Sequence, residues 1–402
     1  MTVPTSRLAP VRSLQIVDTL SMGGAETWLM EVLRLWAARG PGAPTMDILA
    51  TSGNPGLFDD EARGLGARVL HIPFGRRMLP AFVAHFRAVL RDGRYDALHD
   101  HQDRASGWHF LAGVGALPPV RIAHVHNPSY QIRDNYGVSP ARRVTAAAGM
   151  ALVRRLATHV TGTSQHVLDA YGFMTPAFAG VPRAPLYCGF RPERFVGDPD
   201  AARTSVCAEL GWPSDARIVL FAGRIDRSAV RDDPQAHKNA PLAVDVAIAC
   251  AQADARVRVL FAGAPSPAVP VLEGRIAAAG LTGRIRFAGV RSDIERLMLG
   301  SHVLLFPSRE EGLGMVAVEA QAAGLPVVAS TGVPRECAVV PGLTEFVPLG
   351  APIDVWAGAV LRHVDAPRRA PTEANVLVAA SPFAVTESAR RLEALYRTGA
   401  LT

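Results

Sequence analysis

Short runs of apolar, β-branched residues alternate with amphipathic helical patterns along nearly the whole chain. In the first half the apolar runs occupy residues 12–18, 45–51, 68–73, 95–101, 121–127 and 159–164. In the second half they occupy residues 217–223, 257–263, 284–289, 302–308 and 326–330. Strands that are apolar throughout, rather than at every second position, are typical of parallel sheets buried on both faces. The pattern predicts two doubly wound, Rossmann-like α/β domains that face a cleft.

Helical periodicity marks the segments between several of these strands. Residues 25–40 place Leu29, Val32, Leu33 and Trp36 on one face, and Gly40 suits the C-terminal end of that helix. The last segment, 381–397, is also a helix pattern, for which Thr386 and Ser388 are possible caps.

The boundary between the two domains is expected in residues 187–201, which are rich in glycine, proline and aspartate. We therefore assign residues 1–190 to the first domain and residues 191–380 to the second. Residues 381–402 form a terminal helix. In such folds ligands bind beyond the carboxyl ends of the strands.

Composition excludes several classes of protein. The 402 residues are 49% hydrophobic and 19% charged, as in an ordinary globular protein. They contain no run of 18 apolar residues, so we expect no membrane-spanning helix, and residues 1–18 lack the apolar stretch of a signal peptide. The four cysteines show no CxxC spacing and are interpreted as reduced thiols, which favours a cytoplasmic location.

The net charge of +6 is concentrated in the first half of the chain. Residues 1–195 hold 21 arginines and 14 acidic residues, a net charge of +7, and the remainder has a net charge of −1. This balance favours an anionic partner, such as a membrane surface or an acidic acceptor, although a solvated arginine-rich surface explains it equally well. Dispersed arginines without a stacking motif disfavour nucleic acid. Residues 141–157 carry two arginine pairs around an apolar stretch, which fits a membrane-surface helix or a buried helix with charged ends.

Three loops at expected strand ends carry the candidate chemistry. In the first, residues 21–27, Gly23 and Gly24 allow backbone to approach a ligand, although a plain tight turn explains them as well. In the second, residues 221–239, Arg224 and Lys238 suit a diphosphate, with surface charges as the alternative. Lys238 is the single lysine beside 41 arginines, which favours a site that needs a compact point charge, with chance survival of one lysine as the alternative.

The third loop, residues 308–330, contains two carboxylates eight positions apart around a glycine turn. Glu311 precedes the expected helix and Glu319 lies inside it, while residues 312–315 offer backbone donors at a positive helix end. A carboxylate can accept two hydrogen bonds from the neighbouring hydroxyls of a sugar. Together these groups outline a nucleotide-sugar site; separately, a capping and a solvent-facing glutamate would explain the two acids.

At these residues, and over nearly its full length, the chain resembles the family 4 glycosyltransferases, retaining enzymes of the GT-B fold. Glu311 and Glu319 fit the family's Glu-x7-Glu signature, followed by GLPVVAS. Arg224 in FAGRID and Lys238 in HKN match its diphosphate-binding pair, GGAE matches its first glycine loop, and the final helix pattern matches a helix that crosses back to the first domain.

The resemblance implies a role for each matched residue. Glu319 would bind the ribose, Glu311 would contact the transferred sugar near the reacting centre, and Gly24, beside Gly23, would approach the diphosphate. His126 in RIAHVHN matches the first-domain histidine near the sugar, and it fits better than His124 because it lies nearer the strand end; a structural histidine is the alternative. Hydroxyls or phosphate would be held by backbone N–H groups of the turn, which are those of Gly312, Leu313, Gly314 and Met315.

The chain departs from the family pattern at two places. Cys188 and Arg191 stand where the family commonly has Asn and Asp in the linker, which changes the linker rather than the donor site. Residues 228–237 form a long insertion before Lys238 and leave its reach open.

The function implied is retaining transfer of a hexose from a nucleotide-diphosphate donor, UDP favoured over GDP, to a hydroxyl acceptor. The acceptor, lipid-linked or a small molecule, would belong to cell-envelope or exopolysaccharide synthesis at the inner membrane face. No metal is expected, since positively charged side chains would take its place. Residues 99–103 resemble a metal-binding sequence but are interpreted as a strand-end loop. A nucleotide-sugar epimerase and a non-catalytic nucleotide-sugar binder remain alternatives; a phosphorylase would need a second lysine for its pyridoxal cofactor.

Overall fold

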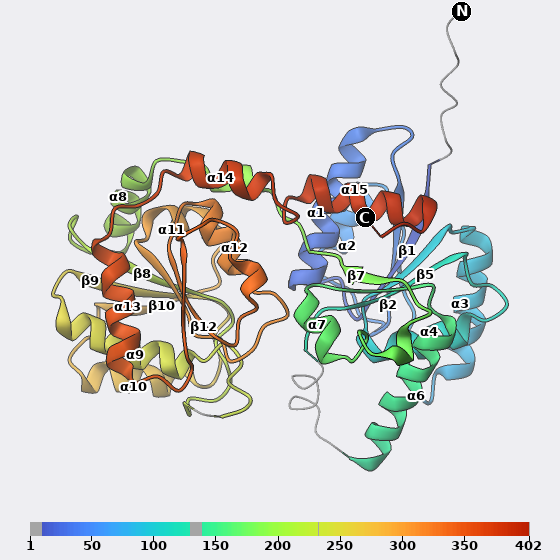
Figure 1. Cartoon of the computed structure of the whole chain (residues 1–402), viewed down its shortest axis with the longest axis horizontal. Coiled ribbons are helices and arrows are strands. Elements are labelled where there is room, and N and C mark those ends of the chain that lie inside the picture. The colour runs from blue at the N-terminus through green and yellow to red at the C-terminus, as the bar shows by residue number, and fades with distance from the viewer. Residues whose placement is uncertain (1–9, 129–138, 232, 402) are drawn as a thin grey trace, which may run out of the picture. The chain divides into compact units, whose positions relative to one another are not determined.

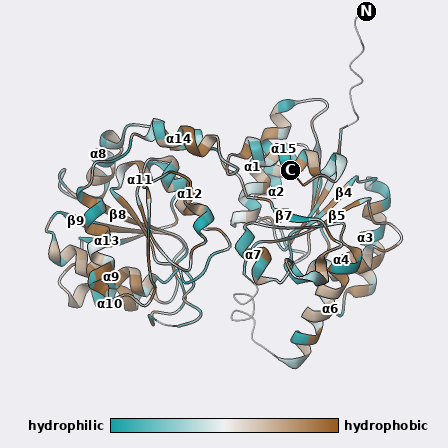
Figure 2. Cartoon of the chain, in the orientation of Figure 1, coloured by the Kyte–Doolittle hydropathy of each residue, from teal (hydrophilic) through white to brown (hydrophobic). Residues whose placement is uncertain are grey.

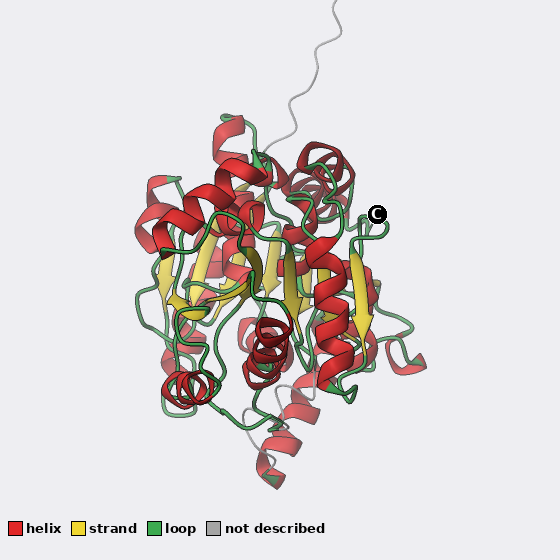
Figure 3. Ribbon diagram, turned by 90° about the vertical axis from the view of Figure 1, so that its left-hand side faces the viewer, coloured by secondary structure: helices red, strands yellow, loops and turns green. Residues whose placement is uncertain are grey.

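The computed structural model describes residues 10–128, 139–231 and 233–401. Contacts divide the chain into two compact units, Met1–Phe190 with Pro382–Thr402, and Arg191–Ser381. Each unit holds one all-parallel sheet with helices beside it (Figure 1), and Figure 3 shows strands running side by side between layers of helices. Residues 1–9, where no signal peptide was expected, and Asp232, in the insertion before Lys238, lie outside the described residues.

The sheet of the first unit is seven-stranded, with the order β3-β2-β1-β4-β5-β6-β7. The chain adds strands on one side of β1 and then returns to add β4 on its other side, so the carboxyl ends of β1 and β4 form a topological switch point. The strands are β1 (Arg12–Val17), β2 (Thr45–Ala50), β3 (Val69–His71), β4 (Ala97–Asp100), β5 (Val120–Val125), β6 (His159–Gly162) and β7 (Arg183–Pro185).

The C-terminal helix belongs to the first unit, where it packs on α1. Trp28 Nε1 of α1 donates to Ser388 Oγ of α15 at 2.7 Å, and Ser388 Oγ donates to the carbonyl of Tyr187 at 3.0 Å. Because α15 begins at Val385 without a side-chain cap, the expectation that Thr386 or Ser388 caps it is wrong. The helices are α1 (Gly24–Arg39), α2 (Asp59–Gly64), α3 (Leu79–Gly93), α4 (Ser106–Gly113), α6 (Pro140–Leu156), α7 (Gln165–Ala170) and α15 (Val385–Thr398).

The second unit has a six-stranded sheet of order β10-β9-β8-β11-β12-β13, with a switch point between β8 and β11. Its strands are β8 (Arg217–Ala222), β9 (Val257–Ala262), β10 (Ile285–Gly289), β11 (Val303–Phe306), β12 (Val327–Ser330) and β13 (Thr344–Val347). Its helices are α8 (Pro199–Leu210), α9 (Ala240–Ala253), α10 (Val269–Ala278), α11 (Ile294–Gly300), α12 (Met315–Ala322), α13 (Ile353–Asp365) and α14 (Pro371–Ala379).

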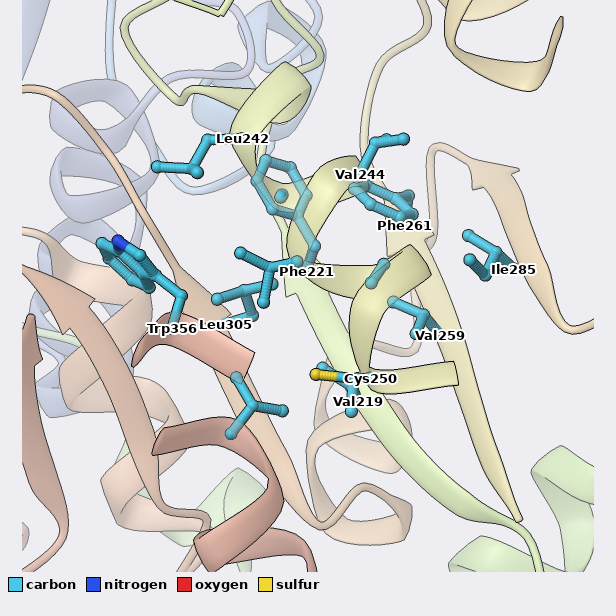
Figure 4. Close-up of a cluster of buried hydrophobic side chains, with 14 of the residues drawn as sticks. Val219, Phe221, Leu242, Val244, Cys250, Val259, Phe261, Ile285, Leu305 and Trp356 are labelled. Carbon is cyan, nitrogen blue, oxygen red and sulfur yellow. The ribbon is translucent and has the colours of Figure 1, made fainter. Parts of the chain in front are cut away.

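Apolar strands and the inner faces of α9 and α13 build the core of the second unit. Phe221, Phe261, Leu305 and Trp356 are all buried in one cluster (Figure 4), and in Figure 2 hydrophobic colour follows the strands while hydrophilic colour lies on outer helix faces. Burying a side chain of this size contributes roughly 1.5–3 kcal/mol. This core holds β8 and β11 in register, and so places the loops that leave their carboxyl ends.

Candidate functional site

The switch point of the second sheet gathers most of the candidate residues. β8 ends at Ala222, and the segment to α9 carries Arg224 and Lys238. β11, which pairs with β8, ends at Phe306, and the segment to α12 carries Glu311. Two loops with opposite charges therefore leave the same edge of the sheet from neighbouring strands.

Lys238 and Glu311 form a direct ion pair. Lys238 Nζ donates to Glu311 Oε1 at 2.6 Å, and the ammonium lies 5.8 Å from the ring centroid of Phe306 at the end of β11. The side chains are 27% and 11% exposed, so water screens this pair less than an ordinary surface pair. A half-buried carboxylate thus holds the only lysine in the chain at a strand end.

Asp226 fixes the backbone around Lys238. Its buried carboxylate accepts the N–H of Lys238 at 3.2 Å and that of Ala240 at 3.4 Å, at the start of α9, and burial raises its pKa. Asn239 between them is left-handed, with φ of 57°. Arg309 N donates to the carbonyl of His237 at 2.7 Å, which joins the two loops. Arg224, exposed in the same segment, contributes a second cation to this edge.

The glycine turn before α12 is shaped by close packing. Gly314 precedes the helix with φ of 89°, and a Cβ there would lie 2.9 Å from both Phe306 and Val333. Gly312 and Leu313 are buried, and Met315 opens the helix half-buried. No side chain of the described residues caps α12, so its positive end can serve an anion or a hydroxyl.

Glu319 lies one turn inside α12 and is half-buried. Burial raises its pKa to about 7, the nearby charge of Glu295 adds to the shift, and Arg194 opposes it. Glu319 is therefore only partly ionised at neutral pH, whereas Glu311 has a cation at hydrogen-bond distance. The two acids of the motif occupy different electrostatic environments.

In the first unit, Gly23 and Gly24 lie where β1 leads into α1. Gly23 is extended, and a Cβ on it would lie 2.2 Å from Glu26 Oε2, so a larger residue there would displace the end of the Glu26 side chain. Gly24 is exposed in open space at the first helical position. Glu26 is the last residue of the GGAE match, but sequence reasoning gave it no role; its pKa is raised by burial and by nearby Asp18.

His126 belongs to a cluster of four histidines that sequence reasoning treated separately. His99 and His101 come from the end of β4, and His124 and His126 from the end of β5, its parallel neighbour. His101 Nδ1 and His126 Nε2 are 2.9 Å apart, and His99 Nε2 and His124 Nδ1 are 3.0 Å apart. The signal in the sequence was histidine at every second position in two successive strands, which puts all four on one face of the sheet.

Burial keeps these imidazoles neutral. The pKa of His126 is lowered to about 3, and the pKa values of the other three are lowered well below their ordinary value. Ring nitrogens of His99, His101 and His124 lie within 4.8 Å of one another, a spacing from which a metal ion could be held. The interpretation of residues 99–103 as a plain strand-end loop was therefore incomplete.

Two family models match the chain. Residues 216–365 match the model described as glycosyl transferases group 1, and residues 23–183 match the glycosyl transferase 4-like domain. The first match includes Arg224, Lys238, Glu311 and Glu319, and the second includes His126.

Individual proteins agree with these matches. Glycosyltransferase EpsF of Bacillus subtilis is 27% identical, and the matched region spans 89% of this chain and 88% of EpsF. D-inositol 3-phosphate glycosyltransferase 1 of Catenulispora acidiphila is 30% identical and covers 94% of this chain and 91% of its own. The crystal structure of Anabaena HepE in complex with UDP and glucose superposes with a TM-score of 0.75 at 19% identity, covering 95% of this chain and 98% of its own.

Proposed function

Because the chain belongs to the glycosyltransferases of the GT-B fold, we propose that it transfers a hexose from a nucleotide-diphosphate donor to a hydroxyl acceptor, with retention of anomeric configuration. UDP is favoured over GDP as the nucleotide. The observation that carries the proposal is the Lys238–Glu311 pair at the switch point of the second sheet. This pair supports the proposal because an ammonium suited to a diphosphate lies beside a carboxylate suited to the hydroxyls of a sugar.

The donor would be held by its charges and its hydroxyls. Lys238 and Arg224 would bind the diphosphate, together with backbone N–H groups at the start of α12. Glu319 would accept hydrogen bonds from the ribose, and Glu311 from the transferred sugar. HepE, which shares the fold, has been crystallised with UDP and glucose, and this supports a uridine nucleotide as the first donor to test.

The chemistry would depend on stabilising the leaving group. Negative charge builds on the departing diphosphate as its bond to the anomeric carbon breaks, so cations fixed at that place lower the barrier. We propose that Lys238 and Arg224 do this without a divalent metal ion. Turnover should then persist after dialysis against EDTA, and a requirement for added Mg²⁺ or Mn²⁺ would contradict the proposal.

The acceptor is proposed to be a lipid-linked sugar or a small hydroxylated molecule of envelope or exopolysaccharide synthesis. Among the described residues, every helix is too short or too polar to cross a bilayer. α6, however, exposes Arg142, Arg143 and Val144, and these fit the surface of an anionic membrane. The C. acidiphila relative takes its name from a small phosphorylated cyclitol, so soluble acceptors belong in the same screen.

Co-sedimentation with vesicles tests the membrane proposal. We expect binding to phosphatidylglycerol vesicles at low salt, lost on replacing Arg142 and Arg143 with glutamate. The same replacement of Arg154 and Arg155, near the other end of α6, shows whether vesicle binding depends on the Arg142–Val144 end alone or on both arginine pairs. Absence of binding at low salt would leave a soluble acceptor as the proposal.

A donor screen tests the activity. The protein is incubated with UDP- and GDP-sugars and an acceptor panel, and nucleotide release and the anomeric configuration of the product are measured. Glu311→Ala should lower turnover at least 100-fold, whereas the adjacent Glu310→Ala should leave most of it. Nucleotide-sugar binding without turnover would favour a sensor, and conversion of the free donor to its epimer would favour an epimerase.

A further inference from the structure

The histidines of the first unit form part of a continuous hydrogen-bonded chain. Gln15 of β1 lies at its centre: Nε2 reaches Ser13 Oγ at 3.0 Å and Tyr396 Oη at 3.1 Å, while Oε1 faces His101 Nε2 at 3.0 Å. From His101 the chain continues to His126, where His101 Nδ1 and His126 Nε2 are 2.9 Å apart. Ser13 and Gln15 are both fully buried, so bulk water does not compete for their hydrogen bonds.

Ser13 determines the orientation of the Gln15 amide. The hydroxyl of Ser13 has one hydrogen, and it donates this hydrogen to the carbonyl of Thr45 at 3.2 Å. Ser13 Oγ can therefore only accept from Gln15, which requires the NH₂ group on that side and the carbonyl oxygen toward His101. An inverted amide would place two acceptors against each other.

The amide orientation in turn determines the tautomer of each histidine. Gln15 Oε1 only accepts, so His101 carries its proton on Nε2 and presents a bare Nδ1. Neutral His126 must then donate from its own Nε2 to His101 Nδ1. His126 is the Nε2–H tautomer, and its only lone pair is on Nδ1, the atom that lies 4.0 Å from Cys188 Sγ.

In the second arm, hydrogen-bond donation continues in the same direction along the chain, away from Gln15. Tyr396 accepts from Gln15 and donates to His99 Nδ1 at 2.7 Å, and His99 Nε2 donates to His124 Nδ1 at 3.0 Å. These bonds occupy both ring nitrogens of His99 and His101, whose rings are stacked with centroids 4.2 Å apart. Stacked rings do not aim their lone pairs at one point, so the geometry favours this chain over a metal centre.

Further contacts fix the backbone of His126. Its N–H donates to Asp103 Oδ1 at 3.2 Å, and its carbonyl accepts from Thr163 Oγ1 at 3.1 Å. Asp103 has a positive φ of 51°, a conformation that costs energy in a residue other than glycine. The ring of His126 is thus constrained at its Nε2 side and along its backbone, and its Nδ1 is an acceptor that faces the weak thiol donor of Cys188, which a hydroxyl can replace.

We propose that Ser13, Gln15 and His101 are positioning residues that hold His126 as its Nε2–H tautomer, so that Nδ1 accepts a hydrogen bond from a hydroxyl of the bound substrate. The role of His126 toward a hydroxyl rests on the proposed function, whereas the tautomer does not. Because Nε2–H of His126 donates to the acceptor His101 Nδ1 on the far side, the ring is polarised and Nδ1 becomes a stronger acceptor. Ser13, fully buried in β1, acts on His126 only through this chain.

Long-range ¹H–¹⁵N spectra of the full-length protein, labelled at histidine, report the tautomers directly. The signals of His126 are identified by their loss in His126→Gln. We expect an Nε2–H pattern for His126, and appearance of the Nδ1–H pattern in Ser13→Ala, because the amide of Gln15 is then free to invert. Thr161→Val is the matched control, since it removes another buried hydroxyl from the same sheet, on the residue paired with His124.

Tyr396→Phe separates the two arms and serves if Ser13→Ala is poorly folded. It removes the hydroxyl that donates to His99 Nδ1 but leaves Ser13 to orient the amide, so the ¹⁵N signal of His99 Nδ1 should shift while His126 keeps the Nε2–H pattern. An Nδ1–H pattern for His126 in the wild type would overturn the proposal, as would an unchanged His126 in folded Ser13→Ala. Saturable Zn²⁺ binding that shifts His99, His101 and His124 together would overturn it in favour of a metal site.

Kinetic measurements test the second part of the proposal, the hydrogen bond from a substrate hydroxyl to His126 Nδ1. If Nδ1 of His126 accepts a substrate hydroxyl, kcat/KM of Ser13→Ala should fall in proportion to the fraction of Nε2–H tautomer lost, and Thr161→Val should stay within about twofold of the wild type. Full transfer activity in His126→Gln would overturn that part and leave the chain as structure alone. Absence of any transfer activity would contradict the proposed function without changing the tautomer result.

Discussion

Lys238 Nζ lies 2.6 Å from Glu311 Oε1, so the one lysine of the chain is already paired before any donor binds. A diphosphate must compete with Glu311 for this ammonium. We therefore expect Glu311→Gln to keep or strengthen UDP binding while transfer falls at least 100-fold. Lys238→Met should weaken UDP binding about 10-fold or more, since a hydrogen bond to a charged group is worth roughly 1.5–3 kcal/mol. Isothermal titration with UDP and a transfer assay measure the two effects.

Lys238→Arg is the informative companion of these variants. Arginine keeps the charge but replaces a compact ammonium with a planar fork, so UDP binding should lie between that of the wild type and that of Lys238→Met. If Glu311→Gln lost UDP binding as fully as Lys238→Met, Glu311 would be a determinant of nucleotide binding, and its assignment to the sugar would be wrong.

Arg224 and Arg227 provide a matched pair in the segment that follows β8. Both side chains are exposed and lie three residues apart, but only Arg224 is assigned to the diphosphate. Arg224→Ala should weaken UDP binding by about 1.5–3 kcal/mol, with a smaller loss for uridine. Arg227→Ala should leave both affinities within about twofold. Equal losses in the two variants would indicate a general electrostatic effect of the loop.

The raised pKa of Glu319 predicts that donor binding depends on pH. Its pKa is raised to about 7 by burial, and the ionised carboxylate is the form that accepts two hydrogen bonds from a ribose. Donor affinity should therefore rise with pH up to about 7 and then level off, changing about tenfold per pH unit on the acid side. Glu319→Gln should abolish this dependence. Titrations with UDP and with a 2′,3′-dideoxy analogue between pH 5.5 and 8.5 measure it.

The same group carries a stability change of opposite sign. A carboxyl whose folded pKa is raised binds more protons in the folded state, so the free energy of unfolding falls as pH rises from about 4.5 to about 7. Glu319→Gln should remove that slope. Glu295→Gln takes away one charge that raises the pKa and should move the affinity midpoint to lower pH. A midpoint unmoved in both variants would assign the pH dependence to another group.

The sequence predicted the two parallel sheets because most of their strands are short runs rich in apolar, β-branched residues, as expected for strands buried on both faces. It missed β7 and β13, the last strand at one edge of each sheet. β7 has three residues and includes Pro185, and β13 is only partly buried, with Thr344 and Glu345 among its four. Edge strands are covered less completely, so their sequences need no continuous apolar run.

The candidate site was predictable as residue types but not as contacts. Glycine, lysine and glutamate at strand ends indicated a diphosphate and a sugar, yet nothing in the spacing joined Lys238 to Glu311 across 73 positions. The role of Asp226 in holding the loop depends on the left-handed turn at Asn239, which the sequence does not reveal. The histidine chain was missed because its centre, Gln15, is an uncharged residue inside β1, whereas the candidate residues were chosen at the ends of strands.

Gly314 gives the sharpest test of how the turn before α12 is built. Its φ of 89° disfavours any side chain, and a Cβ would in addition lie 2.9 Å from Phe306 and Val333. Gly342 has a comparable φ of 81°, but open space surrounds it. Left-handed strain costs roughly 1–2 kcal/mol, and overpacking adds about 1–3 kcal/mol, so Gly314→Ala should destabilise the second unit clearly more than Gly342→Ala.

The functional consequence follows from the same contact. Alanine at position 314 would push the start of α12 away from Phe306, the ring beside Lys238 Nζ. UDP affinity should therefore fall about 10-fold in Gly314→Ala and remain near the wild-type value in Gly342→Ala, with urea unfolding and calorimetric titration as the measurements. A Gly314→Ala variant that is destabilised but binds UDP normally would show that the turn serves folding alone, and the proposed phosphate contact at α12 would have to be abandoned.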